Sequence, residues 1–348
     1  MSRLEEMVSD LLYWYRYHAR VLPWRENPSA YHVWVSEIML QQTRVEAVRG
    51  YYMRFLEELP TVRALADCPE DKLLKLWEGL GYYSRVRNLQ KAAKIICEVY
   101  GGELPDSVEL LQKLPGIGAY TAGAIASIAF AKAEPAVDGN FLRVLSRVEG
   151  SRADIADPAV KKSMTEQLRP IMPKEESGAL NQAVMDVGAT ICIPNGEPHC
   201  DECPLQHLCV AFHEELTSVI PVKAAKKPRR IEEKTVFLIQ YRDRLLIRKR
   251  KETGLLAGMW EYPNTDGHVE KKQLKQILAD MLRISPKSVS EPVSLPKAKH
   301  IFTHIEWHMD VYRVSISEEP SEQYLAVTPK ELSESYSLPS AFGKIRRD

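Results

Sequence analysis

The spacing of the apolar residues changes at about residue 220, and this change constrains the fold more than any other feature of the chain. From Leu4 to about Phe212, apolar residues recur every three or four positions among good helix formers, which predicts an all-α domain. Farther along, segments such as Thr235–Tyr241 and Trp307–Val314 predict β-strands, and Lys271–Leu282 predicts a helix. The second part is therefore expected to be an α+β domain.

A segment with neither pattern joins the two predicted domains. Residues 219–234 contain two prolines and a run of lysines and arginines, which indicates a basic interdomain linker. The linker could be a solvated tether or could lie along a phosphate backbone. The expected boundaries are residues 1–218 for the helical domain and 235–348 for the α+β domain, and a length of 348 residues suits two cores.

The overall composition is that of a globular protein without a membrane segment. The 47 basic side chains equal the 47 acidic ones, so a nucleic-acid-binding surface would have to arise from local clustering of charge. Acidic residues stand near the amino terminus where a secretory signal would be basic and then apolar, and no stretch is long enough to span a bilayer. We therefore expect a cytoplasmic protein that does not bind membranes, and we expect it to be a monomer.

Two glycines mark a tight turn between helices at Leu114-Pro-Gly-Ile-Gly118. Gly116 and Gly118 would let a phosphate approach the backbone N–H groups at the start of the next helix, which is expected at Ala119–Phe130. A glycine-containing turn between packed helices is common, so this motif alone is only moderately specific for DNA binding. The helix that follows is small and apolar, which predicts its burial.

Two acidic residues have surroundings that suit catalysis. Glu37 lies among Val35, Ile38 and Met39 in an apolar segment, which would raise its pKa and keep it able to donate a proton. By itself, a glutamate on an amphipathic helix is more often solvated. Asp138 stands in Pro135-Ala-Val-Asp-Gly-Asn140, just before another amphipathic helix, where it could also be only an N-cap.

Four of the six cysteines are concentrated in one short stretch, residues 192–209. They are Cys192, Cys200, Cys203 and Cys209, and seven, two and five residues separate them. In a reducing compartment such cysteines are more often ligands than disulfides, and four thiolates can close a tetrahedral site for a soft metal ion or a cluster. The spacing by itself does not exclude zinc.

The order of hairpin, aspartate and cysteine cluster resembles the endonuclease III superfamily of DNA glycosylases. In that superfamily, bifunctional members have a lysine at the second position after the last glycine of the hairpin, and its amine forms a Schiff base with the sugar. Here that position is Tyr120. Without the amine, the covalent imine route lacks its nucleophile, and the resemblance implies a monofunctional glycosylase.

Segments near the amino terminus narrow the resemblance to the adenine DNA glycosylase family, MutY. They are Leu22-Pro-Trp-Arg25, the run from Trp34 to Arg44, and the run from Trp77 to Leu89. The family removes adenine mispaired with 8-oxoguanine during base excision repair. The resemblance therefore implies a partner, double-stranded DNA with 8-oxoguanine:adenine or guanine:adenine mispairs, and a cofactor, a [4Fe–4S] cluster. The family has six residues in the first cysteine interval, so the loop Ile193–His199 carries one extra residue.

The resemblance also implies roles in catalysis. Glu37 would protonate adenine and help to handle water, and Asp138 would stabilise the sugar cation electrostatically or covalently. Tyr120 and Asn140 would support the two acids. Such a pair of carboxylates with opposed duties parallels glycoside hydrolysis.

Further residues are implied in substrate binding. The resemblance puts Gln42 and Tyr82 at an intercalation site beside 8-oxoguanine, and puts Arg20, Trp24 and Gln182 around the extruded adenine. Phosphate contacts are expected from the hairpin, from Arg85, Arg87 and Lys91, and from the linker at residues 226–230.

The α+β domain resembles Nudix-like domains in its segment Thr253–Pro263. The acidic helix that binds metal in Nudix hydrolases is missing, because Lys271–Leu282 has no paired glutamates. This domain is expected to bind and not to hydrolyse. Phe302, Thr303 and His304 resemble the loop with which the family recognises 8-oxoguanine, with threonine in place of serine.

Two other functions stay open on sequence grounds. One is a related glycosylase that acts on thymine or oxidised pyrimidines, which Glu37 and Tyr120 disfavour. The other is a non-catalytic, redox-active DNA-binding module in which the carboxylates are structural.

Overall fold

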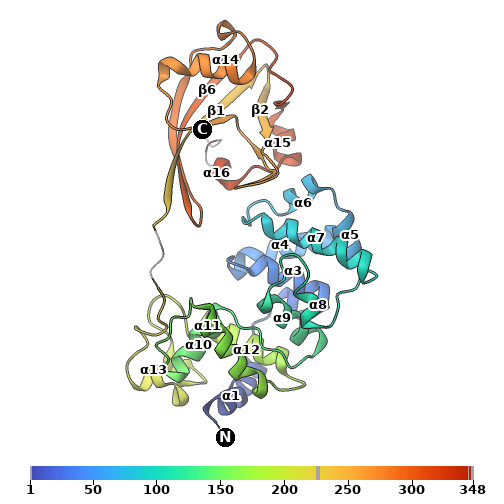
Figure 1. Cartoon of the computed structure of the whole chain (residues 1–348), viewed down its shortest axis with the longest axis vertical. Helices are drawn as coiled ribbons and strands as arrows, with labels where there is room; N and C mark the ends of the chain where they lie inside the picture. The colour runs from blue at the N-terminus through green and yellow to red at the C-terminus, as the bar shows by residue number, and fades with distance from the viewer. Residues whose placement is uncertain (1, 225–227, 344, 346–348) are drawn as a thin grey trace. The chain divides into compact units, whose positions relative to one another are not determined.

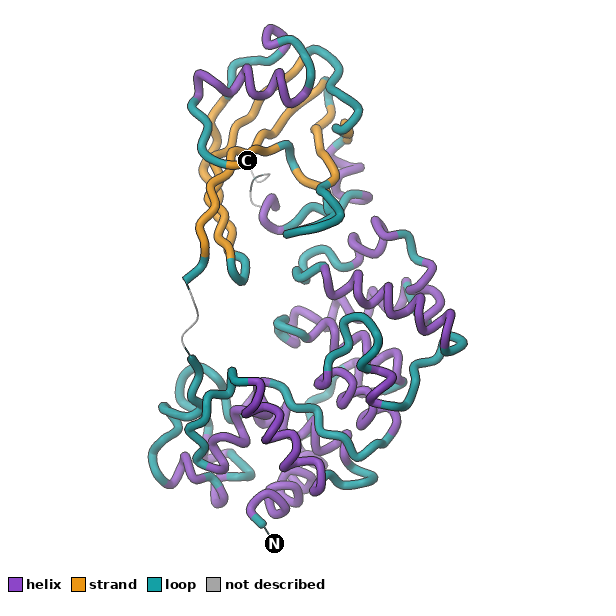
Figure 2. The backbone as a smooth tube through the Cα atoms, viewed as in Figure 1, coloured by secondary structure: helices purple, strands orange, loops and turns teal. Residues whose placement is uncertain are grey.

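The computed structural model describes residues 2–224, 228–343 and 345 of the chain (Figure 1). These residues form two compact units. The first unit contains residues 1–67 and 84–225, and the second contains residues 68–83 and 226–348. In the described part of the chain, the strands belong to the second unit and the first unit is helical (Figure 2).

The first unit is built from α-helices and short 3₁₀ turns. Its α-helices are α1 (Arg3–His18), α2 (Pro23–Glu26), α3 (Ala30–Leu40), α4 (Val45–Glu58), α5 (Val62–Asp67), α7 (Ser84–Val99), α8 (Val108–Leu111), α9 (Ala119–Phe130), α10 (Gly139–Glu149), α11 (Pro158–Leu168), α12 (Ser177–Thr190) and α13 (Val210–His213). The predicted all-α class is confirmed, and α9 has the bounds that the sequence predicted.

Side chains at the helix ends and along the apolar faces explain why these segments fold as they do. Ser2 caps α1 in a reciprocal pair with Glu5, which satisfies N–H groups that the first turn leaves free. The apolar face of α1 packs with α10 and α12 into a core that includes Leu11, Phe141 and Val184. Helix α9 is mostly small and apolar, and its middle, Thr121–Ser127, is buried, as its composition predicted.

The second unit contains a mixed β-sheet. Its strands are β1 (Arg230–Tyr241), β2 (Arg244–Lys249), β3 (Trp260–Glu261), β4 (Asn264–Asp266), β5 (Val293–Ile301), β6 (Ile305–Ile316) and β7 (Leu325–Val327). The main path runs β3-β2-β1-β6-β5, with β1 parallel to β6, while β4 pairs with β1 and β7 with β2. The α+β class is thereby confirmed.

Each face of this sheet is covered by different helices. Helix α14 (Leu274–Leu282) packs on Phe237 and Val314 of one face. Helices α15 (Pro329–Ser335) and α16 (Ser340–Gly343) pack on the other, around Trp307. The alternation of buried side chains along β6 follows from the twofold period of a strand, which sends successive side chains to opposite faces.

The two units differ from the predicted domain boundaries in two places. Strand β1 begins at Arg230, inside the segment predicted to be a linker, and residues 225–227 of that segment lie outside the described residues. Residues 68–83, which include α6 (Glu70–Leu76), belong to the second unit although the sequence pattern assigned them to the helical domain. Among the described residues, no helix has the length and apolar character needed to cross a membrane.

Candidate active site

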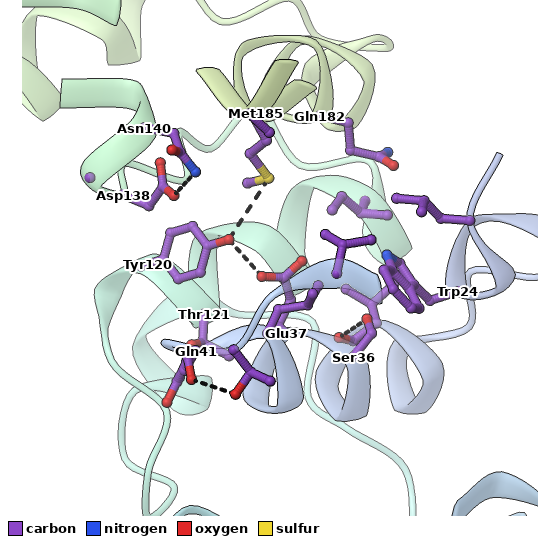
Figure 3. Close-up of a pocket in the computed structure, with 18 of the residues that line it drawn as sticks. Trp24, Ser36, Glu37, Gln41, Tyr120, Thr121, Asp138, Asn140, Gln182 and Met185 are labelled. Atoms are coloured by element: carbon purple, nitrogen blue, oxygen red, sulfur yellow. Dashed lines mark hydrogen bonds between the residues drawn. The ribbon is translucent and has the colours of Figure 1, made fainter. Parts of the chain in front are cut away.

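A cavity of about 670 Å³ in the first unit is lined by parts of α3, α9, α10 and α12 (Figure 3). It brings together residues that are far apart in the sequence. All four residues predicted to be catalytic line it, namely Glu37, Tyr120, Asp138 and Asn140. Of those predicted to bind substrate, Arg20, Trp24, Gln42 and Gln182 line it as well.

Glu37 is buried on α3, with only 6% of its surface exposed. Burial raises the pKa of Glu37 from 4.5 to about 7, and the nearby charge of Asp138 adds to the rise. The Tyr120 hydroxyl donates a hydrogen bond of 2.6 Å to Glu37 Oε2, and this bond and the charge of Arg25 lower the pKa. The carboxyl group is therefore divided between its protonated and ionised forms near neutral pH.

Asp138 is the N-cap residue of α10, and it also lines the cavity. Its Oδ1 accepts a 2.8 Å hydrogen bond from the Phe141 backbone N–H, and its Oδ2 accepts a 2.9 Å bond from Asn140 Nδ2. Burial raises the pKa of Asp138, and these hydrogen bonds oppose the rise. They fix the direction of both carboxylate oxygens.

A buried arginine connects Asn140 with the first cysteine. Arg143 donates 2.9 Å and 2.7 Å hydrogen bonds to Asn140 Oδ1 and to the Gly188 carbonyl, and its Nε donates a 2.7 Å bond to the Cys192 carbonyl. The carboxylate of Asp138 is thereby joined through two side chains to the segment that carries the cysteines.

Asp186 anchors two arginines at the other side of the cavity and is fully buried. Arg25 donates to both carboxylate oxygens at 2.7 and 2.9 Å, and the Arg20 side chain donates at 2.7 Å. No motif in the sequence predicted a function for Asp186 or Arg25. The Trp-Arg pair in the amino-terminal motif could have drawn attention to Arg25, whereas nothing in the sequence indicates that Asp186, more than 150 positions away, is its partner.

The remaining side chains give the cavity a mixed character. Trp24 packs edge-on against Tyr52 at 5.5 Å between ring centres, and Met185 approaches the Tyr120 hydroxyl at 3.8 Å. Gln182 Nε2 donates a 3.3 Å bond to the Gly178 carbonyl one turn earlier. An apolar wall with a few fixed polar groups is typical of a binding site for a small molecule.

The glycine hairpin between α8 and α9 has the geometry that its sequence predicts. Gly116 has a φ of +79°, and a Cβ at that position would lie 2.8 Å from Asn88 Cβ, so no larger residue fits without a shift. Gly118 is extended at the N-cap of α9, with open space where a Cβ would be. An anion could therefore approach the first N–H groups of α9 closely.

The four clustered cysteines line one small cavity, together with Arg147. Arg147 donates a 3.2 Å hydrogen bond to Cys192 Sγ. Within the described part of the chain, no three His, Cys, Asp or Glu side chains are close enough to hold a single metal ion. Four thiols that line one cavity fit a sulfur-ligated metal ion or cluster.

The extra residue of the first cysteine interval is absorbed in an exposed bulge. The His199 N–H donates a 3.0 Å bond back to the Ile191 carbonyl, which ties the two ends of the loop together. Gly196, with a φ of +82°, lies in the exposed middle of the loop. Cys192 and Cys200 each follow directly after one of these two bonded residues.

Known proteins resemble both units. Residues 35–170 match the model of the HhH-GPD superfamily of base excision DNA repair proteins, and residues 235–347 match that of the NUDIX domain. The chain is 36% identical over 367 residues to the adenine DNA glycosylase of Mus musculus, covering 90% of this chain and 71% of the mouse protein. It is 34% identical over 309 residues to that of Buchnera aphidicola subsp. Schizaphis graminum, covering 88% and 87%. The chain belongs to the adenine DNA glycosylase family.

Solved structures agree with this membership for the helical part. A thermostable thymine-DNA glycosylase superposes with a TM-score of 0.56 at 27% identity, covering 61% of this chain and 97% of that one. Endonuclease III in a non-covalent complex with DNA gives 0.54 at 25% identity, covering 62% and 99%. As a member of the adenine DNA glycosylase family, the chain is a base excision repair enzyme of the DNA glycosylase class, and enzymes of this family generally carry an iron–sulfur cluster.

The residues that the family resemblance assigns to 8-oxoguanine recognition lie in the second unit. Phe302, Thr303 and His304 form the turn between β5 and β6, where Phe302 packs edge-on against Trp307. The Thr303 and Tyr82 oxygens are 3.0 Å apart. Tyr82 thus joins Thr303 within this unit, although 221 positions separate them.

Residues expected to contact phosphate have partners of their own in the structure. Arg229 donates a 3.1 Å bond to the Phe302 carbonyl, and Arg230 pairs with Glu232. Lys226 and Lys227 lie outside the described residues. Arg85 caps α3, a role that the sequence did not indicate.

Proposed function

We propose that the chain is a monofunctional glycosylase that hydrolyses the N-glycosidic bond of adenine mispaired with 8-oxoguanine or guanine. The observation that carries this proposal is the buried Glu37–Tyr120 pair, which shares a cavity with Asp138. Burial raises the pKa of Glu37 to about 7, and at Asp138 hydrogen bonds from Phe141 and Asn140 oppose the rise in pKa that burial causes. Pairs of carboxyl groups in such contrasting settings act as acid and charged partner in other glycoside-cleaving sites.

In the proposed mechanism, Glu37 donates its proton to N7 of the extruded adenine. Protonation makes the base a better leaving group, and a positioned acid contributes about 10²- to 10⁴-fold in rate. As the bond breaks, positive charge develops on the sugar; water then adds to the sugar carbon, and the ionised Glu37 accepts the proton that the water loses. Asp138 stabilises that charge because Phe141 and Asn140 keep its oxygens oriented and favour the ionised form.

The other polar groups of the cavity bind and orient the base. Trp24 offers a flat apolar surface, and Gln182 can both donate to and accept from the edge of a purine. Asp186 pairs with Arg20 and Arg25 and keeps both in fixed positions. The charge of Arg25 therefore stays close enough to Glu37 to lower its pKa. Tyr120 holds Glu37 in place and supplies no amine for an imine, in keeping with a monofunctional enzyme.

Cys192, Cys200, Cys203 and Cys209 would hold a [4Fe–4S] cluster. Four thiols around one cavity and the bond from Arg147 to Cys192 Sγ support this, since thiolate ligands of such clusters accept hydrogen bonds. The cluster would supply four sulfur-bridged irons that crosslink this segment and can change oxidation state. The Cys192 carbonyl and the side chains of Arg143 and Asn140 extend from this segment to Asp138.

The test is the identity of the free base released from a panel of duplexes. We expect adenine from duplexes with 8-oxoguanine:adenine or guanine:adenine, no release from an adenine:thymine control, and strand scission only after alkali treatment. Thymine or an oxidised pyrimidine as the released base would indicate a related glycosylase. DNA binding without release of any base would indicate a non-catalytic module.

Glu37→Gln tests the role of the acid directly. The amide keeps the shape of the side chain but has no proton to transfer, so single-turnover release should fall by at least about 100-fold while duplex binding persists. Glu57→Gln on the exposed surface of α4 is the matched control and should leave release unchanged. Comparable release by the Glu37 variant and the control would exclude the general-acid role.

A further inference from the structure

Arg85, in the first turn of α7, reaches the carboxyl-terminal end of α3, the helix that bears Glu37. One terminal nitrogen of its guanidinium donates to the Ile38 carbonyl at 2.8 Å, to the Met39 carbonyl at 3.0 Å and to the Gln41 carbonyl. The other donates to Thr43 Oγ1 at 3.3 Å. A single side chain thus connects the last turn of α3 to the turn that follows it.

The chemistry of a helix end explains why a guanidinium suits this position. The last carbonyls of a helix have no partner within the helix, and the negative end of the helix dipole attracts a cation. A guanidinium donates in two directions from one rigid plane, whereas an ammonium is a flexible point charge. Lysine at position 85 could supply the charge, but not the simultaneous hold on the helix carbonyls and on Thr43.

The turn that Arg85 holds has an unfavourable backbone conformation. Gln42 has a φ of +59°, in the left-handed region that residues with a Cβ seldom adopt. Such a residue persists only where its neighbours fix it. Besides Arg85, the fixing contacts are a 3.4 Å bond from Gln41 Nε2 to Thr121 Oγ1 and a 3.2 Å bond from the Thr43 N–H to the Leu40 carbonyl.

Gln42 lines the same cavity as Glu37, one turn of chain beyond the end of α3. We propose that Arg85 is a positioning residue for base extrusion, and that it holds Gln42 in the strained conformation that keeps its side chain at the cavity that receives the base. This inference rests on the proposed adenine glycosylase function. The turn is already strained in the free protein. Binding of DNA therefore requires no further strain in this turn, and none adds to the cost of unstacking the base.

The experiment compares substrates that differ in how much extrusion they demand. One is an 8-oxoguanine:adenine duplex, and the other is the same strand with adenine opposite an abasic site, where the base has no partner and leaves the stack more easily. Arg85→Met and Arg85→Lys should both slow single-turnover release from the paired duplex by about tenfold, which corresponds to about 1.4 kcal/mol. Release from the abasic duplex should change by less than about twofold on the same reasoning.

Two controls separate positioning from general damage. Lys94→Met removes an exposed charge from the same helix and should leave both rates unchanged. Both substrates are measured on one preparation of each variant, so any misfolded fraction cancels in the ratio of the two rates. In the Glu37→Gln background, fluorescence of 2-aminopurine at the adenine position should fall when Arg85 is replaced, because fewer bases are unstacked.

Coupling to Gln42 gives the decisive outcome. If Arg85 acts through Gln42, Arg85→Met combined with Gln42→Ala should be no slower on the paired duplex than the slower single variant. Equal losses on both duplexes, or effects that multiply in the double variant, would overturn the proposal. Failure of the unaltered protein to release adenine from either duplex would instead refute the proposed function.

Discussion

At the scale of single residues, the proposed mechanism depends on a protonated Glu37 and an ionised Asp138. Burial raises the pKa of both carboxyl groups, and at Asp138 the hydrogen bonds from Phe141 and Asn140 oppose that rise. Each also affects the other, because the charge of Asp138 raises the pKa of Glu37. Release of adenine should therefore fall on the alkaline side, as Glu37 loses its proton, and on the acid side, as Asp138 gains one.

Tyr120→Phe should move the alkaline limb of that profile to higher pH. The Tyr120 hydroxyl stabilises ionised Glu37 and thus lowers its pKa, so removing it lets the pKa rise above about 7. A hydrogen bond to a charged group is worth about 1.5 to 3 kcal/mol, which predicts a shift of about one pH unit or more. The measurement is the single-turnover rate from pH 5 to 9. An unmoved limb, or one that moves to lower pH, would contradict this account of Glu37.

The sequence predicts the residues of the proposed reacting centre but not their supports. Glu37, Tyr120, Asp138 and Asn140 stand in compact motifs that resemble those of the adenine DNA glycosylase family, and this resemblance predicted that they share a site. Asp186 could not be predicted, because a buried ion pair depends on which faces of two distant helices meet. The periodicity of a helix indicates that a face is buried without indicating what packs against it.

At the scale of elements, the segment after α12 is held by one arginine of α10. Arg147 donates to Cys192 Sγ at 3.2 Å, and at 2.8 Å each to the carbonyls of Thr217 and Ile220, which lie beyond the last cysteine. Both ends of the cysteine segment are therefore fastened to the same side chain. The sequence predicted the cysteines as ligands, but it could not predict this fastening, because backbone carbonyls have no sequence signature.

Arg147→Met should weaken cluster retention. The change leaves the Thr217 and Ile220 carbonyls without their donor and removes a cation beside a thiolate, a loss of about 3 kcal/mol or more from several buried hydrogen bonds. We expect less iron and sulfide per chain after dialysis against a chelator, and a lower melting temperature. Arg152→Met, at an exposed position after α10, is the control. Iron content and melting temperature equal to those of the control would contradict the fastening role.

At the scale of the whole molecule, residues 68–83 belong structurally with the carboxyl-terminal unit. Leu338 N–H donates to Glu78 Oε1 at 2.9 Å, Ser337 Oγ donates to the Leu74 carbonyl at 3.3 Å, and Lys249 pairs with Asp71. The apolar period of α6 resembles that of the other helices, so the sequence alone could not separate this segment from the helical domain. Deleting the chain from residue 235 onward would remove the partners of α6 as well as the turn between β5 and β6. Such a deletion therefore cannot test the role of that turn in recognition by itself.

Point substitutions in the turn between β5 and β6 test lesion recognition with both units intact. 8-Oxoguanine differs from guanine in an N7–H donor and a C8 oxygen, which a hydroxyl acceptor and a nearby donor can distinguish. Thr303 and His304 are exposed in this turn, and the Thr303 hydroxyl is 3.0 Å from that of Tyr82. Thr303→Ala together with His304→Ala should therefore reduce the preference for adenine opposite 8-oxoguanine over adenine opposite guanine.

Losing one or two hydrogen bonds of about 1 kcal/mol each predicts a reduction of roughly tenfold in that preference. The measurement is the ratio of single-turnover rates on the two duplexes, and the rate opposite guanine should stay nearly constant because the catalytic cavity is unaltered. Thr303→Ser keeps the hydroxyl and should keep the preference, which separates loss of the hydroxyl from disturbance of the turn. If the double variant discriminates as well as the unaltered protein, this turn does not recognise the lesion, and Gln42 or Tyr82 must do so.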